Sequence, residues 1–231
     1  IKANKKPIVL IACHSWFDFP HLFGMRNFTD FLDWINTILK LAKKKKDVLW
    51  LFRPHPQEEW YGGFYFKDLI DKNLPQNIKV VDKEYSTDQI LSVSDFVVTH
   101  HGTIGMEAVS RGIPVLCADK NHYSDWKFCT IAKSKNNFLN QLSDIQKLKK
   151  PNKKQMDLAN LCAFLILGPN KGHKNFIYFL PDHFSSLSIT ISIIKLFFIN
   201  KKDIKIQLEF IKKWIDSDSK SFTIFQKMNP N

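Results

Sequence analysis

The residues best suited to do chemistry form a turn between an apolar run and a predicted helix, at His100-His101-Gly102-Thr103-Ile104-Gly105. A helix that begins near Thr103 leaves its first backbone amides unpaired and adds partial positive charge at that end. Gly102 allows a ligand to approach the backbone closely, and the Thr103 hydroxyl and the His101 ring can donate hydrogen bonds. These features favour a phosphate-binding turn in which all six residues are candidate contacts. A tight strand-to-helix turn with a threonine cap is the alternative interpretation.

Three further polar residues can complete such a site. Glu107 follows Thr103 by one helical turn and shares its face, where a carboxylate could accept hydrogen bonds from ribose hydroxyls. An exposed helix glutamate is the alternative. Arg53 and His55 follow another apolar run, and the prolines on either side of His55 fix the direction of this loop. A guanidinium there suits bidentate contact with phosphate, with a salt bridge at the strand end as the alternative.

The loop after the first apolar run carries His14, Asp18 and His21. These are metal-ligand residue types, but their irregular spacing favours a polar loop that faces a ligand crevice, and we expect no metal. Asp18 is a candidate general base for an acceptor hydroxyl, and His14 is the second candidate catalytic residue.

Strands and helices alternate along the first half of the chain. Apolar runs typical of buried parallel strands stand at residues 7–12, 48–52, 78–81, 96–99 and 114–117. Helices are predicted over 28–43 with Asn27 as N-cap, from a capping box at 86–89, and over 103–111 with Gly112 as the end. The alternation predicts an α/β fold, a Rossmann-like parallel sheet with helices on both faces. Ligands of such sheets bind at the carboxyl ends of the strands, where the candidate residues stand.

The second half of the chain shows helical patterns without evident chemistry, over 138–148, 156–167, 185–198 and 204–215. We therefore expect a Rossmann-like nucleotide-sugar-binding domain at 1–133 and a helical extension packed on it at 134–231. No apolar stretch approaches the roughly 20 residues that a membrane span requires. The strand-like opening suggests that the sequence begins at a domain boundary inside a longer protein.

The composition is that of a globular and strongly basic chain, with 44% apolar residues, a net charge of +12 and a pI of about 9.5. Nucleic acid, an anionic membrane face or a phosphorylated small molecule could account for the charge, although lysine runs are also typical of solvated helix ends. No nucleic-acid-binding motif is present, so we expect no such partner and keep an anionic membrane surface as a candidate. Four cysteines without C-x-x-C spacing favour buried, reduced thiols in a cytoplasmic protein, peripheral on the inner membrane face.

The stretch at 94–115 resembles the donor-binding, carboxyl-terminal half of GT-B-fold glycosyltransferases. With the His-Ser-x-x-Asp-x-x-His loop at 14–21 and Arg-Pro-His-Pro at 53–56, the likeness is to the capsule polysaccharide biosynthesis family, which includes bacterial beta-Kdo transferases. The segment at 118–123 is similar, more distantly, to CDP-glycerol glycerophosphotransferases. The resemblance covers residues 7–123 and implies a cytidine nucleotide, with UDP-sugars as another option. It also implies an amino-terminal acceptor-binding domain outside this sequence.

The same resemblance assigns roles to residues of this chain. It implies that Thr103, Arg53 and His55 hold the donor phosphates, that Glu107 holds the ribose or the sugar, and that Tyr123 belongs to the nucleotide-sugar site.

The candidate site and the resemblance together predict a glycosyltransferase of bacterial capsule or surface polysaccharide biosynthesis. It would transfer a sugar from a CMP-Kdo-like, CDP-linked or UDP-linked donor to a glycan or glycolipid acceptor. We expect neither metal nor cofactor, because Arg53, the histidines and the helix dipole can stabilise the leaving phosphate. One alternative is a nucleotide-sugar epimerase of the same fold, with His14, Asp18 and His21 as acid-base residues. The other is a non-catalytic basic binding module, which would bind polyanions in a salt-sensitive way.

Overall fold

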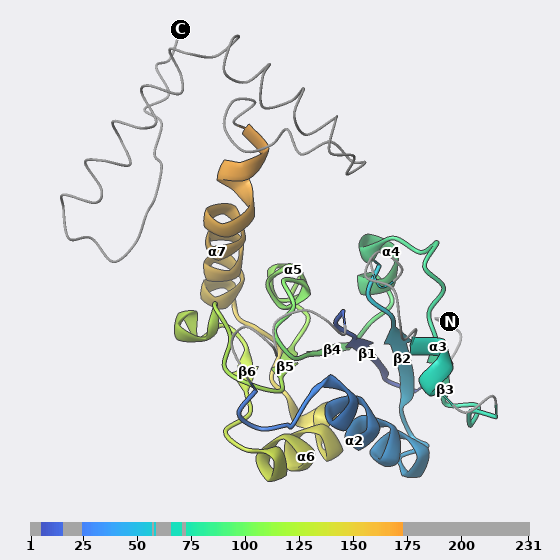
Figure 1. The fold of residues 1–231 in the computed structure, drawn as a ribbon. Coiled ribbons are helices and arrows are strands. Elements are labelled where there is room, and N and C mark those ends of the chain that lie inside the picture. The colour runs from blue at the N-terminus through green and yellow to red at the C-terminus, as the bar shows by residue number, and fades with distance from the viewer. Residues whose placement is uncertain (1–5, 16–24, 57, 59–65, 71–72, 173–231) are drawn as a thin grey trace, which may run out of the picture. The chain divides into compact units, whose positions relative to one another are not determined.

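A computed structural model describes residues 6–15, 25–56, 58, 66–70 and 73–172 (Figure 1). Its centre is a six-stranded parallel sheet with the strand order β3-β2-β1-β4-β5-β6. The strands are β1 (Ile8–Ala12), β2 (Leu49–Arg53), β3 (Ile78–Val80), β4 (Phe96–Thr99), β5 (Val115–Cys117) and β6 (Thr130–Ile131). The five predicted strands are confirmed. The sequence did not suggest β6, because a strand of two residues carries too little pattern to be recognised.

The central strand β1 lies between β2 and β4. Leu10 is in register with Leu51 of β2 on one side and with Val97 of β4 on the other. All residues of β1 are buried, because both faces of the sheet are covered, and this explains its unbroken apolar run. The chain passes outward from β1 to β2 and β3, then returns to β4 on the other side of β1. The strand order therefore switches between β1 and β4, the place where ligands of such sheets bind.

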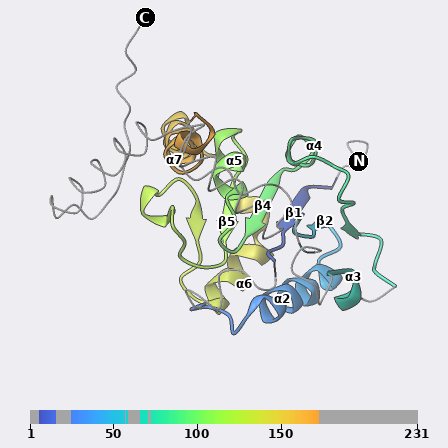
Figure 2. The same cartoon turned by 45° about the horizontal axis from the view of Figure 1, so that its top comes forward.

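Helices cover both faces of the sheet, as predicted (Figures 1 and 2). One face carries α2 (Phe31–Lys44) and α6 (Lys135–Ser143), and the other carries α4 (Thr87–Leu91) and α5 (Ile104–Ser110). The other described helices are α3 (Phe66–Leu69), α7 (Lys153–Gly172) and the 3-10 turns η2 (Ser124–Trp126) and η3 (Ile145–Lys147). Under α2 and α6 lies a core in which Trp34, Trp50 and Phe138 are fully buried. Burial of one such side chain contributes about 2–3 kcal/mol to stability.

Two helix ends form as their local sequence predicts. At the start of α4, the Gln89 amide donates to Ser86 Oγ (3.2 Å) and the Ser86 amide donates to Gln89 Oε1 (2.9 Å), which is the expected capping box. After α5, Gly112 has a φ of +78°, the left-handed conformation that ends many helices at a glycine.

The start of α2 differs from the prediction. Its N-cap is Asp30, whose carboxylate accepts from the Asp33 amide (2.7 Å), and not Asn27. The side-chain amide of Asn27 donates instead to the carbonyl oxygens of Ala118 (2.8 Å) and Ala132 (3.0 Å). Asn27 therefore ties the loop before α2 to the ends of β5 and β6, a tertiary role that the sequence does not reveal.

The boundary predicted at residue 133 falls inside one packed unit. Phe138 and Leu142 of α6 and Ile145 of η3 belong to the same core as the residues of α2. One compact unit extends over Ile1–Ala163 and a second over Phe164–Asn231, so that α7 crosses the division. The helices predicted at 185–198 and 204–215 lie outside the described residues.

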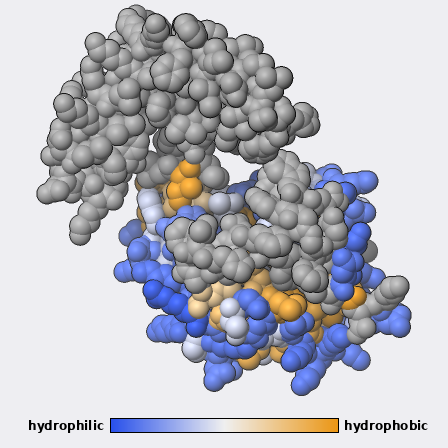
Figure 3. Space-filling model, viewed as in Figure 1, coloured by the Kyte–Doolittle hydropathy of each residue, from blue (hydrophilic) through white to orange (hydrophobic). Residues whose placement is uncertain are grey.

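The four cysteines are free thiols, and Cys13, Cys117 and Cys162 are buried as predicted. Cys129 is half-buried, and its sulfur lies 3.7 Å from that of Cys117. On the face shown in Figure 3, hydrophilic side chains occupy most of the described surface, with apolar ones near its middle. No helix among the described residues is long and apolar enough to cross a membrane.

Candidate functional site

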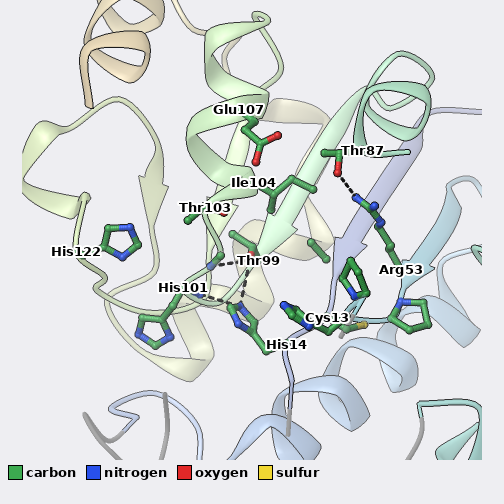
Figure 4. A pocket seen from close by; sticks show the side chains of 15 residues that line it. Cys13, His14, Arg53, Thr87, Thr99, His101, Thr103, Ile104, Glu107 and His122 are labelled. Carbon is green, nitrogen blue, oxygen red and sulfur yellow. Dashed lines mark hydrogen bonds between the residues drawn. The ribbon is translucent and has the colours of Figure 1, made fainter. Parts of the chain in front are cut away.

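A pocket of about 400 Å³ opens at the carboxyl ends of β1, β2 and β4, at the switch point of the sheet (Figure 4). The ends of these three strands supply loops that are far apart in the sequence. The pocket brings together many of the predicted site residues, namely His14, Arg53, His55, His101, Gly102, Thr103, Ile104 and Glu107. The expectation that these loops meet at one edge of the sheet is therefore confirmed.

The turn between β4 and α5 is held by hydrogen bonds on both sides. On the β4 side, Thr99 Oγ1 accepts from the Gly102 amide (3.2 Å). A Cβ atom on Gly102 would lie 2.8 Å from this same oxygen, so the turn requires glycine there. On the other side, the Tyr123 hydroxyl donates to the Gly102 carbonyl oxygen (2.8 Å). The backbone of this turn is thus fixed before any ligand binds.

The turn leaves hydrogen-bond donors open to the pocket. Thr103 is exposed at the N-cap position of α5, and its hydroxyl makes no capping hydrogen bond. The amides of Thr103 and Ile104 donate to no acceptor among the described residues, since the first helical bonds come from Gly105 and Met106. Because α5 has only seven residues, these individual donors matter more than the helix dipole. Together they can receive an anionic oxygen.

Arg53 reaches the pocket from the end of β2. Its Nη1 donates to Thr87 Oγ1 (2.9 Å) and its Nη2 to the Tyr85 carbonyl oxygen (3.5 Å). Burial lowers the pKa of the guanidinium, and the Glu107 carboxylate opposes that shift. Arg53 forms no ion pair within the described part of the chain, so the strand-end salt bridge considered above is not what the structure shows. A positive group is thus held half-buried without an ion pair to any described carboxylate, and it remains charged because its pKa starts far above 7.

Three buried histidines hold the turn, and with each ring taken as neutral their contacts assign the ring protons. The Lys120 carbonyl oxygen, 3.0 Å from His101 Nε2, can only accept, so this nitrogen carries hydrogen. His101 Nδ1 is then an acceptor and takes the hydrogen of His100 Nδ1, 2.5 Å away. His14 Nε2 accepts from the His101 amide (3.0 Å), which places the His14 proton on Nδ1.

The environment keeps two of these rings neutral. Burial, with the neighbouring histidines, lowers the pKa of His14 to about 3 and that of His100 to about 2. The His14 ring stacks on Phe31 with centroids 4.8 Å apart, and its Nε2 is already occupied. Such a histidine does not take up a proton near neutral pH. His14 lines the pocket and fixes the turn through the His101 amide, and its catalytic role stays a prediction.

Three other predicted contacts do not reach the pocket. His100 is fully buried against Phe28, Phe31 and Trp34. Gly105 faces Tyr123, where an added Cβ would lie 2.3 Å from the hydroxyl oxygen. Tyr123 is itself fully buried. The prediction that His100, Gly105 and Tyr123 contact a ligand directly is thus corrected. These residues support the turn from the side away from the pocket.

The other candidates of the first loop, Asp18 and His21, are outside the described residues, and their roles stay predictions. Among the residues that the structure describes, no group of three or more His, Cys, Asp or Glu side chains could hold a metal ion.

Sequence reasoning missed several residues of the pocket. Thr87 lines it and orients Arg53, although the sequence drew attention to it only as part of a capping box. His122 lines it at an exposed position directly before Tyr123, and the polar segment after β5 was the available signal. Cys13 also lines it, but burial raises the pKa of its thiol, so it does not ionise to a nucleophile there.

No family model matches the chain, and no curated protein matches its sequence. Solved structures similar to it include the beta-Kdo 2,4 transferase KpsC of Thermosulfurimonas dismutans, with a TM-score of 0.47, 16% identity, and coverage of 68% of this chain and 44% of that one. The beta-Kdo 2,7 transferase KpsC of the same organism has a TM-score of 0.44 and 16% identity, covering 84% and 55%. A UDP-GlcNAc 2-epimerase from Neisseria meningitidis has a TM-score of 0.40 and 16% identity, covering 71% and 44%.

The chain spans about half of the length of these structures. Because glycosyltransferases and an epimerase both occur among these structures, the likeness does not select an activity.

Proposed function

We propose that this chain is the donor-binding half of a glycosyltransferase of bacterial capsule or surface polysaccharide biosynthesis. Its pocket would hold a nucleotide-activated sugar, of a CMP-Kdo-like, CDP-linked or UDP-linked kind. The observation that carries this proposal is that one pocket contains a guanidinium without an ion pair and two amides without an acceptor among the described residues. They belong to Arg53, Thr103 and Ile104.

These groups suit the phosphate of such a donor. A guanidinium and backbone amides that point at the same oxygens form charge-assisted hydrogen bonds, which are about twice as strong as neutral ones. Glu107 lines the same pocket, and its carboxylate cannot bind phosphate but can accept from sugar hydroxyls. The pocket therefore offers complementary partners for the two ends of a sugar-phosphate group.

The same arrangement suits the transfer step. When the bond between the anomeric carbon and the phosphate oxygen breaks, its electrons remain on the phosphate, and the developing charge lies next to Arg53 and the open amides. The acceptor hydroxyl attacks the anomeric carbon and loses its proton to a base. None of the described residues is assigned this role, and Asp18 remains a candidate. The acceptor would be a growing glycan or glycolipid, bound with the help of an amino-terminal domain outside this sequence.

Calorimetric titration of the full chain with CMP, CDP and UDP tests the donor site. We expect one nucleotide to bind best, and Arg53→Ala to weaken that binding by about 10-fold or more, the worth of a charged hydrogen bond. Thr103→Val, which removes only the open hydroxyl, should weaken it less. Arg111→Ala is the matched control, because this arginine is exposed, pairs with Asp88 and does not line the pocket.

Three outcomes would contradict the proposal. A folded chain that binds none of the nucleotides would exclude a donor site in this pocket. Conversion of a nucleotide sugar in the absence of acceptor would favour the epimerase alternative. Salt-sensitive binding of polyanions without preference for any nucleotide would favour the basic binding module.

A further inference from the structure

Basic side chains from separate segments gather at the amino ends of the strands, on the edge of the sheet opposite the pocket. We define the amino-edge patch by six of them: Lys6, Lys44, Lys46, Arg111, Lys149 and Lys150. Lys6 precedes β1, Lys44 ends α2 and Lys46 precedes β2. Arg111 follows α5, and Lys149 and Lys150 follow η3. All six are exposed.

Hydrogen bonds and shared hollows show that these segments lie together. The Lys6 ammonium donates to the Lys46 carbonyl oxygen (2.8 Å), and Gln146 Nε2 donates to Asp47 Oδ2 (3.1 Å). A hollow of about 650 Å³ is lined by Lys6, Arg111 and Lys150. A second hollow, of about 400 Å³, is lined by Lys149 and also by Lys150, so the two adjoin. Lys6, Arg111, Lys149 and Lys150 therefore share one surface, and the chain at Lys46 adjoins it.

The positive charge of this surface is largely uncompensated. Lys44, Lys46, Lys149 and Lys150 form no ion pair among the described residues, while Arg111 pairs with Asp88 (2.6 Å). Two acidic side chains at the same edge form ion pairs, Asp47 with Lys45 and Asp144 with Lys147. Asp95, which accepts from the Ile8 amide and lines the first hollow, offsets only one of the positive charges. The edge thus keeps a positive field that a partner of opposite charge would neutralise.

We propose that the amino-edge patch docks the chain on an anionic lipid surface, with the nucleotide pocket facing away from the headgroups. Five of its six basic residues are lysines, compact charges that interact with a diffuse layer of phosphates without fixed geometry. Sequence-specific nucleic-acid sites depend instead on arginine forks and stacking aromatic rings. The patch contains none of the large exposed apolar side chains of the described region, which are Leu32, Val80, Tyr85 and Leu161.

Vesicle flotation with the full chain tests this docking surface. At about 0.1 M salt we expect binding to phosphatidylcholine vesicles that contain about 30% phosphatidylglycerol, and none to phosphatidylcholine alone. The variant Lys149→Glu/Lys150→Glu should bind about 10-fold more weakly or worse, since each lysine near the surface contributes separately. Lys79→Glu/Lys133→Glu is the matched control, with the same change of net charge at exposed positions outside the patch. It should retain most of the binding.

Circular dichroism of each variant checks that it is folded. Nucleotide titration of each variant checks the pocket, which is a separate site from the docking surface. Nucleotide affinity should be the same in both variants, whether or not they float with vesicles. Equal binding to neutral and anionic vesicles would overturn the proposal, and so would an equal loss in both variants. Tighter binding to single-stranded nucleic acid than to the anionic vesicles at the same salt, lost in the patch variant, would assign the patch to nucleic acid instead.

Discussion

At the scale of single residues, the contact between Gly105 and Tyr123 controls the shape of the turn. The tyrosine ring is fully buried beside α5, and its hydroxyl holds the carbonyl of Gly102. The space that a Cβ on Gly105 would need is already filled by that hydroxyl, at 2.3 Å, and by the ring carbon next to it, at 3.0 Å. The glycine is therefore required by packing, although its sequence context suggested contact with a ligand.

This packing predicts a double-mutant effect. Gly105→Ala should destabilise the chain by about 1–3 kcal/mol, the usual cost of overpacking a filled site. Tyr123→Phe should cost about 1 kcal/mol for the lost hydrogen bond. The two changes together should cost less than their sum, because removal of the hydroxyl relieves the worst clash. Urea unfolding of the three variants measures this, and strict additivity would contradict it.

Glu107 permits a second test at this scale, which rests on the proposed nucleotide site. If its carboxylate accepts from a ribose hydroxyl, Glu107→Gln should weaken binding of the preferred ribonucleotide by about 10-fold. The same variant should bind the corresponding 2′-deoxynucleotide as well as the unchanged chain does. Calorimetry with both nucleotides gives the coupling between side chain and hydroxyl. An equal loss for both would show that Glu107 contacts another part of the ligand.

At the scale of elements, the turn from β4 to α5 depends on histidines that must stay neutral. His14 and His100 come from the ends of two neighbouring strands and interlock through His101. Their folded pKa values, about 3 and about 2, lie below the value of roughly 6.5 for an unfolded histidine. Below that pH the unfolded chain gains protons that the folded chain does not take up. Stability is thus complete above pH 6.5 and falls as the pH drops toward 3.

The expected size of this effect follows from the pH interval. Between about pH 6.5 and pH 5, each of the two histidines should lower the free energy of unfolding by about 2 kcal/mol. His100→Gln, which cannot be protonated, should remove about half of this pH dependence. Urea unfolding at pH 7 and pH 5 measures both chains. The same pH dependence in the variant would show that His100 is protonated in the folded chain.

At the scale of the whole molecule, the compact unit extends well past the sheet. α6 and η3 fill the core beside α2, with Phe138, Leu142 and Ile145 fully buried. A chain that ends at residue 133 would lose all three, or about 6 kcal/mol of burial, which is comparable with the whole stability of a typical domain.

We therefore expect the chain that ends at residue 133 not to unfold cooperatively. A chain that ends at Ala163, the last residue of the compact unit, should unfold in a single cooperative transition. Near-ultraviolet circular dichroism and urea titration distinguish them. Cooperative unfolding of the shorter chain would show that α6 packs on a sheet that is already stable without it.

Much of the fold follows from the sequence because local signals carry it. The apolar runs of the first five strands, the capping box at Ser86 and the helix-ending Gly112 depend on neighbours a few residues away, and each forms as expected. Asn27 and β6 could not be found in this way. The partners of Asn27 are carbonyl groups more than 90 residues distant, and β6 exists only because β5 provides an edge.

The sequence by itself determined which loops carry the site, because parallel strands bring their carboxyl ends to one edge whatever the details of packing. Arg53, Thr103 and Glu107 were found for this reason, and the pocket contains them. Only the tertiary structure decided which polar residues of those loops face the pocket. His100 and Tyr123 have the same hydrogen-bonding chemistry as residues that face the pocket, yet they lie in the core, since the side-chain direction at a turn depends on neighbours from distant segments. The amino-edge patch likewise exists only in three dimensions, because its lysines come from segments that meet where the strands begin.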